Sequence, residues 1–180
     1  YQNTSQTSAI LAVDLKKNNF SPEQNAIIED KLIESVISVL HYCLSKWIPI
    51  SLLYYSESIQ SFTADNPLMF EKLYGILSKV KFLSTVNLSD MLDVHLTGYI
   101  NKANIIIFTS NVGYSLYDQI YKLTLSGYDI SVIYVSPSGA AAYDDSEADY
   151  ILSFLPEIGV TAYKINVNDD IALVLERGVV

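Results

Sequence analysis

Residues 8–15 read SAILAVDL, a run of apolar side chains that ends near an acidic residue. An apolar run of this length predicts a strand that is buried on both faces, as the central strands of parallel sheets are. Residues 103–109, ANIIIFT, have the same character and are rich in β-branched side chains. The two segments therefore predict the centre of a sheet that helices cover on both sides.

Strand-like and helix-like segments alternate along the rest of the chain. We expect strands at residues 8–15, 48–55, 59–63, 103–109, 128–135 and 160–167, and helices at 21–47, 66–80, 87–101, 114–126, 145–155 and 169–177. The turn at residues 56–58 is too short for a crossover, so the third strand should be antiparallel to the second. The longer connections favour right-handed crossovers, which predict a doubly wound, mainly parallel α/β sheet of six strands in the order 3-2-1-4-5-6.

The expected core comes from the apolar centres of the strands and from an apolar stripe on the first helix. Its predicted members are Leu11, Val13, Ile33, Val36, Leu53, Ile106, Phe108, Ile133 and Val135. Because 50% of the 180 residues are apolar, the chain can bury such a core as one domain without a disulfide or a metal. We expect this domain to span residues 8–180, and residues 1–7 to be a linker or the end of an upstream element.

The net charge of the chain and the length of its apolar runs argue against two kinds of partner, nucleic acids and membranes. The formal net charge is −9, and Arg177 is the single arginine. Nucleic-acid binding depends on clustered cations, so we expect no nucleic-acid partner. The apolar runs are far shorter than the roughly 18 residues that span a bilayer, so we expect no membrane contact by this segment itself.

Several segments together carry a resemblance to a known fold. They are SAILAVDL (8–15), WIPISLLYY (47–55), IQSF (59–62), FEKLYGILSKVKFLSTVNLSDML (70–92), NIIIFTS (104–110) and SGYDISVIYV (126–135). In their order they resemble the von Willebrand factor A fold, and more narrowly the bacterial family known as domain of unknown function 58, whose members are often encoded beside MoxR-type AAA+ ATPases. The resemblance implies a domain on the cytoplasmic side, tethered to the membrane through an upstream region, with such an ATPase as a protein partner.

The resemblance also implies a place for a metal-dependent adhesion site, where a D-x-S-x-S loop, a threonine and a second aspartate bind Mg²⁺. Asp14 matches the first aspartate of that pattern. Lys16 and Asn18 stand at the two serine positions, and Ser110 stands where the second aspartate is expected. Asp14 therefore matches the pattern, whereas Lys16, Asn18 and Ser110 differ from the residues that the pattern requires.

These replacements predict a degenerate site that binds no metal, and we expect no cofactor. Mg²⁺ requires near-octahedral oxygen coordination, usually by carboxylates and waters. An ammonium about 4 Å from a divalent cation repels it by a few kcal/mol even at an effective dielectric constant of about 20. Two interpretations of Lys16 stay open: it occupies the place of the cation beside Asp14, or it is a solvated loop residue. The threonine of the pattern falls at Thr85 or at Val86, and the sequence leaves that choice open.

Residues suited to catalysis are few. His41 and His95 are the two histidines, both within predicted helices, and the sequence contains no phosphate-binding loop and no known nucleophile or zinc-protease motif. Residues 144–149 hold four carboxylates, which we interpret as acids favoured near a helix N-terminus rather than as a calcium loop. The sequence therefore indicates a protein that is not an enzyme.

The carboxyl edge of the sheet is the expected binding surface, because ligands of open α/β sheets bind beyond the carboxyl ends of the strands. We define this carboxyl-edge surface as residues 16–20, 84–89, 110–114 and 136–145. It includes Tyr114 and Tyr143, and tyrosine is enriched at protein interfaces. We therefore predict a non-catalytic, metal-independent protein-interaction module. The alternatives are an Mg²⁺-dependent adhesion domain with non-standard ligands, and a hydrolase or nucleotide-binding enzyme on the same sheet.

Overall fold

The computed structural model describes residues 8–96 and 103–177, so the predicted linker at residues 1–7 lies outside the described part. The described strands are β1 (Ala9–Val13), β2 (Ile50–Ser56), β3 (Ser58–Ala64), β4 (Asn104–Thr109), β5 (Asp129–Ser136) and β6 (Thr161–Asn166). The described α-helices are α1 (Pro22–Ser45), α2 (Phe70–Leu77), α3 (Leu88–Leu96), α4 (Tyr114–Leu125), α5 (Ser146–Phe154) and α6 (Ile171–Arg177). Three short 3-10 helices join them: η1 (Pro67–Met69), η2 (Pro137–Gly139) and η3 (Leu155–Ile158).

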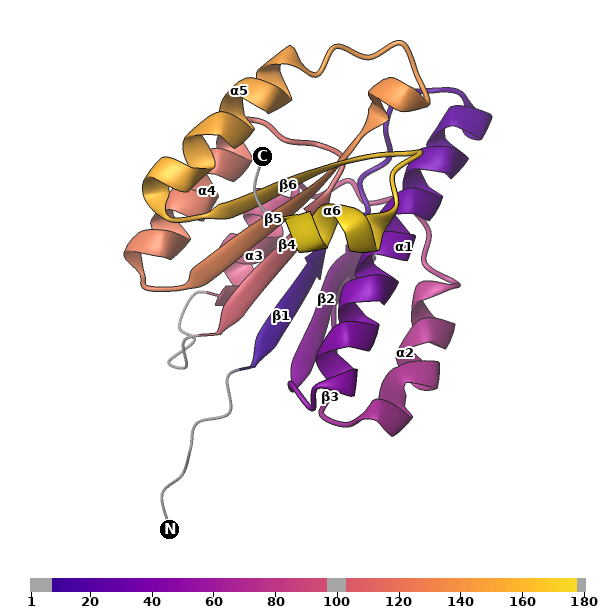
Figure 1. The fold of residues 1–180 in the computed structure, drawn as a ribbon, viewed down its shortest axis with the longest axis vertical. Coiled ribbons are helices and arrows are strands. Elements are labelled where there is room, and N and C mark those ends of the chain that lie inside the picture. Colours follow the sequence, from indigo (N-terminus) through magenta and orange to yellow (C-terminus); the bar gives the residue numbers. More distant parts are fainter. Residues whose placement is uncertain (1–7, 97–102, 178–180) are drawn as a thin grey trace.

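The strands form one mixed sheet in the order β3-β2-β1-β4-β5-β6 (Figure 1). β1 lies near the centre and pairs in parallel with β2 on one side and with β4 on the other. Among the described strands, β3 alone is antiparallel to its neighbour, with Ser56 opposite Ser58 across the turn at Glu57. The predicted strand order and directions are therefore confirmed. β3 is antiparallel to β2 because a turn this short cannot make a crossover.

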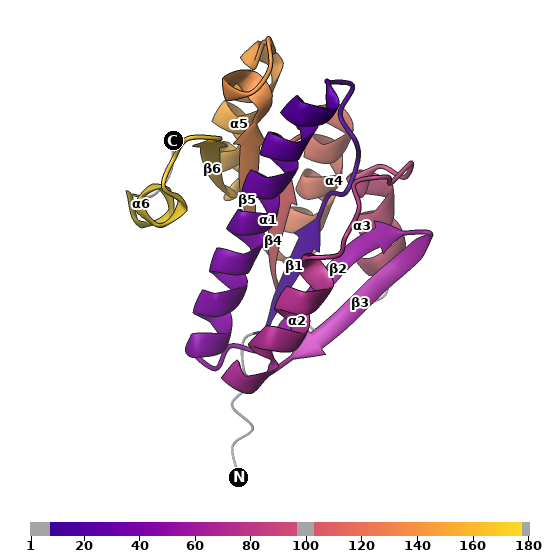
Figure 2. The same ribbon diagram turned by 90° about the vertical axis from the view of Figure 1, so that its right-hand side faces the viewer.

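Helices cover both faces of the sheet (Figure 2). α1, α2 and α6 pack on one face, over a cluster of buried residues that includes Leu11 and Val13, which we call the α1-side cluster. α3, α4 and α5 pack on the other face, over a cluster that includes Ile10 and Ala12. Alternate side chains of β1 thus enter opposite layers of the core, which is why the whole strand is apolar.

The predicted core is confirmed. Ile33 and Ile106 are half-buried against the α1-side cluster, and the other predicted core residues are buried. Phe108 and Leu11 are both 0% exposed, and they come from the two strands that pair at the centre of the sheet.

Helix α1 begins and ends at signals that its sequence contains. The Ser21 hydroxyl accepts a hydrogen bond from the Gln24 backbone N–H at 3.3 Å, and the Gln24 side chain accepts one from the Ser21 N–H at 3.1 Å, which together form a capping box. At the other end the Ile48 N–H donates to the Cys43 carbonyl at 2.9 Å, and Trp47 takes a left-handed φ of 58°. Because α1 follows the carboxyl end of β1 and precedes the amino end of β2, it runs from the carboxyl edge of the sheet to its amino edge.

The structure differs from the predicted helices at several ends. The segment predicted as one helix at 66–80 is divided into η1 and α2, and α2 ends at Leu77. α5 ends at Phe154 rather than at 155, because Pro156 has no N–H with which to continue an α-helix and η3 follows instead. The third predicted helix reaches residue 101, but residues 97–101 lie outside the described part of the chain.

We predict that Ile28→Ala lowers the free energy of unfolding by about 2–5 kcal/mol, whereas Ile27→Ala changes it by about 0.5 kcal/mol or less. The two isoleucines are neighbours on α1, but Ile28 is 1% exposed and Ile27 is 49% exposed. Urea denaturation of both variants measures the difference. Equal losses would show that α1 presents a different face to the sheet.

Candidate functional site

The carboxyl ends of β1 and β4 lie side by side, and their register brings Asp14 next to Thr109. Val13 pairs with Phe108, and the Asp14 backbone N–H donates to the Phe108 carbonyl at 2.9 Å. The Thr109 hydroxyl donates to Asp14 Oδ2 at 2.7 Å, and the Lys16 backbone N–H donates to Oδ1 at 3.0 Å. Both oxygens of this carboxylate are therefore bound by groups of the protein itself.

Burial decides the electrostatics of Asp14, which is 5% exposed. Loss of hydration raises the pKa of this carboxyl above its ordinary value of 3.8, although the hydrogen bonds from Thr109 and from the Lys16 N–H act in the opposite direction. The charge of the Lys16 ammonium is the weakest of the influences that lower this pKa. Hydrogen bonds, rather than an ion pair, therefore hold the carboxylate in place.

The Lys16 side chain extends to a neighbouring loop. Its Nζ donates to Asn87 Oδ1 at 2.9 Å, and no ion pair joins it to Asp14 within the described residues. The backbone of Lys16 also pairs with Ser84 in an isolated parallel bridge. The ammonium thus links the loop after β1 to the loop before α3, and from there its charge still lowers the pKa of Asp14.

The other two replaced ligand positions bond to each other. Asn18 Nδ2 donates to Ser110 Oγ at 3.0 Å, and Ser110 is 4% exposed. Asn25, in the first turn of α1, donates from Nδ2 to the carbonyls of Asn18 at 3.2 Å and Phe20 at 3.0 Å. Side-chain hydrogen bonds thus tie the loop between β1 and α1 to the residue after β4 and to the first turn of α1.

The hydroxyl that donates to Asp14 is that of Thr109. Thr85, one of the two positions expected for the threonine of the pattern, is exposed and lines a separate groove. At the other position, the Val86 N–H donates to Ser84 Oγ at 3.2 Å. The signal in the sequence is that Thr109 is the polar residue at the end of the apolar run 104–109, the strand that pairs with β1.

A small cavity of about 190 Å³ opens beside Asp14. Its lining includes Asp14, Lys16, Asn87 and Tyr143, together with Leu88 and Ser89 of α3 and Ser115 and Leu116 of α4. The Tyr143 ring packs edge-to-face on Phe20 with centroids 5.8 Å apart, and Tyr143 is 39% exposed. Tyr114 is 59% exposed at the start of α4 but does not line this cavity. The structure therefore brings Tyr143 to the Asp14 site and leaves Tyr114 on the outer surface.

The acids at residues 144–149 lie at the N-terminus of α5 as expected, but Asp145 has a different set of partners. Asp144 accepts a hydrogen bond from the first backbone N–H of α5 at 2.9 Å, as an acid at a helix N-terminus should. Asp145 caps nothing with its side chain and accepts from the Tyr134 hydroxyl at 2.7 Å and from Ser136 Oγ at 2.5 Å, with Lys164 Nζ at 3.0 Å. Burial raises the pKa of Asp145, but these hydrogen bonds outweigh it and hold the pKa below the ordinary value. Asp145 therefore joins β5 and β6 to the start of α5.

The residues at the Asp14 site do not fit Mg²⁺. Asp14 is the one carboxylate among the residues that line its cavity, and both of its oxygens already accept hydrogen bonds. Nowhere in residues 8–96 and 103–177 do three His, Cys, Asp or Glu side chains group so that they could hold a metal. Asp14 would therefore offer an ion a single carboxylate whose oxygens are already shared with the Thr109 and Lys16 donors, which is poor coordination for a hard divalent ion.

We predict that Asp14→Asn keeps the local geometry and removes the loss of folding stability that ionisation of Asp14 causes as pH rises. An amide can accept from the Lys16 N–H and donate to Thr109 Oγ1, which itself donates to the Asn111 carbonyl at 3.1 Å. Because the pKa of Asp14 is raised, the folded chain binds its proton more readily than the unfolded chain, and the stability that Asp14 contributes falls as pH rises above about 3.8. The free energy of unfolding of the variant minus that of the wild type should therefore increase from about pH 4 to about pH 7 in urea titrations.

Thr109→Val is the matched comparison, because it keeps the side-chain shape and removes the hydroxyl donor. It should cost about 1.5–3 kcal/mol near neutral pH, since it leaves a buried carboxylate with one donor fewer. A difference between Asp14→Asn and wild type that does not change with pH would contradict the raised pKa.

No protein-family model matches the sequence, and no curated protein matches it. Solved structures share its architecture: the SpRpn10 VWA domain has a TM-score of 0.60 at 8% identity, over 96% of this chain and 95% of that one. The conserved hypothetical protein BatB from Bacteroides thetaiotaomicron has a TM-score of 0.55 at 10% identity, over 95% of each chain. An aerotolerance-related membrane protein from Bacteroides fragilis, solved with multiple mutations to serines, has a TM-score of 0.57 at 9% identity, over 94% of this chain and 97% of that one. Together with the strand order, these likenesses show that the chain has a von Willebrand factor A-like fold.

Proposed function

We propose that this chain is a non-catalytic, metal-independent protein-interaction module that binds its partner through the carboxyl-edge surface. The observation that carries the proposal is the hydrogen bonding of Asp14. Thr109 and the Lys16 backbone each donate to one oxygen of this carboxylate, and no second carboxylate lines the cavity beside it. In this proposal the surface recognises its partner through its own side chains.

The side chains of the carboxyl-edge surface suit a protein partner. Lys16 and Asn87 place an ammonium and an amide at the cavity beside Asp14. Tyr143 and Tyr114 present rings that are 39% and 59% exposed. Aromatic anchors surrounded by polar groups are typical of the energetically important parts of protein interfaces. The VWA-like fold is consistent with an interaction module of this kind.

The positions of the two histidines support a role outside catalysis. His41, on α1, packs edge-to-face on Phe70 with ring centroids 5.2 Å apart. His95 lines a cavity at the opposite edge of the sheet, together with residues from the amino ends of β1 and β2. Neither imidazole lies among the residues that line the cavity beside Asp14.

We further propose, from the resemblance of the sequence, that the partner is a MoxR-type AAA+ ATPase. In this proposal the domain works on the cytoplasmic side of a parent protein whose membrane anchor precedes it. The structure's Bacteroides fragilis neighbour is described as a membrane protein. In the part of this chain that the structure describes, no helix has the length and apolar character needed to cross a bilayer.

We predict that Mg²⁺ and Mn²⁺ bind the chain with a Kd of about millimolar or weaker. A single carboxylate whose oxygens already accept hydrogen bonds offers too few ligands to a hard ion. Calorimetric titration should give the same weak signal for the wild type and for Asp14→Ala. The variant Lys16→Ser/Asn18→Ser/Ser110→Asp restores the ligands of the adhesion pattern and is the comparison for gained affinity. Micromolar binding that disappears in Asp14→Ala would contradict a metal-independent site.

We predict that Tyr114→Ala and Tyr143→Ala each weaken partner capture by up to about thirtyfold, because a buried aromatic anchor contributes about 2 kcal/mol to binding. Lys16→Glu should weaken capture at the same surface. Capture is measured on a purified MoxR-type ATPase and on extract of the native host, and thermal melting is measured on the same samples.

Tyr42→Ala is the matched control for capture. Tyr42 is also 59% exposed, but it lies in the last turns of α1, at the amino edge of the sheet. Capture should be unchanged in this control, and melting should be nearly unchanged in all the tyrosine variants. Two results would place the interface elsewhere. One is partner capture as strong as that of the wild type in Tyr114→Ala, Tyr143→Ala and Lys16→Glu, and the other is an equal loss of capture in Tyr42→Ala.

A further inference from the structure

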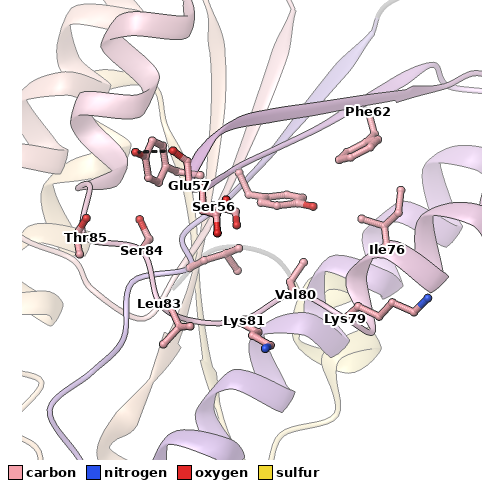
Figure 3. A pocket seen from close by; sticks show the side chains of 13 residues that line it. Ser56, Glu57, Phe62, Ile76, Lys79, Val80, Lys81, Leu83, Ser84 and Thr85 are labelled. Carbon is pink, nitrogen blue, oxygen red and sulfur yellow. Dashed lines mark hydrogen bonds between the residues drawn. The ribbon is translucent and has the colours of Figure 1, made fainter.

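A groove larger than the Asp14 cavity lies beside the carboxyl-edge surface, where β2 and β3 face the end of α2 (Figure 3). Its volume is about 730 Å³, and residues of β2, β3 and the segment from α2 to Thr85 line it. We call it the β3 groove. Its apolar lining consists of Leu15, Tyr54, Phe62, Ile76, Val80 and Leu83. The rings of Tyr54 and Phe62 stack with centroids 6.1 Å apart, and Leu83 is 64% exposed, so the groove presents apolar surface to solvent.

Two lysines make the rim of the β3 groove positive. Lys79 and Lys81 line the groove, are exposed, and form no ion pair with any residue that the structure describes. Glu57 places a single carboxylate on the same rim, so two ammonium groups stand against one carboxylate. In a chain whose net charge is −9, this local excess of positive charge favours an occupant with an acidic side chain.

Strand β3 forms one wall of the groove and is the terminal strand of the sheet (Figure 2). Among the described strands it pairs with β2 alone, so every second residue directs its N–H and C=O groups away from the sheet. Its sequence, SIQSFTA, contains neither a charged residue nor a proline, which are the usual devices that keep an edge strand from pairing. The edge is therefore chemically ready to accept another strand.

A strand added to β3 would direct every second side chain toward the groove. Phe62 lies on this face, because it pairs with Leu52 of β2, a member of the α1-side cluster. A side chain next to Phe62 on the added strand would continue the same face. Apolar side chains at such positions reach the apolar lining, and an acidic one reaches Lys79 or Lys81.

A second copy of this chain fits the edge poorly. If two β3 strands paired antiparallel about Ser61, Glu57 of each copy would lie opposite Asp65 of the other. Carboxylates that face each other across a strand pair are destabilising, and each copy would also bring a net charge of −9. The charges therefore favour a different protein as the occupant.

We propose that the β3 groove binds an extended segment of a partner protein. The segment adds a strand to the edge of β3, inserts apolar side chains into the groove and places a carboxylate on Lys79 or Lys81. This inference rests on the proposed function in that it requires a protein partner, but it uses residues that do not touch Asp14.

The test uses a random peptide-display library selected on the wild-type chain, and synthetic copies of the selected peptides. These peptides should combine apolar residues with Asp or Glu, and the double variant Lys79→Glu/Lys81→Glu should raise their Kd about tenfold. Lys72→Glu is the matched control, because Lys72 is an exposed lysine of α2 that does not line the groove, and it should change the Kd by about twofold or less.

Methylation of the peptide backbone tests the strand pairing. Only every second N–H of an added strand faces β3, so methyl groups on one alternating set of nitrogens should abolish binding, and those on the other set should be tolerated. The inference is overturned if both sets are tolerated equally, if the double variant binds as tightly as the wild type, or if the library yields no binding peptide.

The partner-capture assay separates this inference from the proposed function. Loss of capture in both Lys16→Glu and Lys79→Glu/Lys81→Glu supports both. Loss in Lys16→Glu alone keeps the proposed function and overturns the groove as the docking site. Loss in Lys79→Glu/Lys81→Glu alone supports the groove and overturns the carboxyl-edge surface.

Discussion

The complete burial of β1 is the constraint on which the rest of the structure depends. β2 and β4 pair with both of its edges and helices cover both of its faces, so its residues are at most 4% exposed. Asp14 follows the strand directly and shares its burial. A carboxylate removed from water is costly unless donors compensate it, and the neighbouring strand end and the following loop supply two. The chemistry of the site is thus a consequence of where the central strand ends.

Hydrogen-bond donors of the protein organise this end of the sheet. Once Thr109 and the Lys16 backbone satisfy Asp14, the side chains of Lys16 and Asn18 are free to bond elsewhere. They reach Asn87 and Ser110, so the loop after β1 is joined to the loop before α3 and to the end of β4. The bond from Asn18 to Ser110 is partly buried, and desolvation strengthens it relative to one in water. The carboxyl-edge surface is therefore held in one arrangement by the chain itself.

The two surfaces proposed for binding meet in one segment of the chain. Ser84 pairs with the backbone of Lys16 and also lines the β3 groove, while Asn87, three residues later, accepts from the Lys16 ammonium. A partner that adds a strand to β3 would therefore contact the same segment that positions Lys16. The edge of β3 offers backbone hydrogen bonds and the carboxyl-edge surface offers side chains, so the two surfaces would contribute different interactions to one interface.

Local patterns in the sequence determined the strand order, the antiparallel β3 and most of the core, because periodicity and connection length restrict how such a chain can fold. They also indicated that the residues after Asp14 differ from those of the adhesion pattern. Only the tertiary structure decided which groups bond to Asp14. Thr109 lies 95 residues from Asp14, and strand register alone brings the two together. Asp145 sits at the start of a helix, yet its carboxylate binds Tyr134 and Lys164 from neighbouring strands. A buried polar group bonds to whatever donor packing places beside it, and that neighbour is set by the fold rather than by nearby sequence.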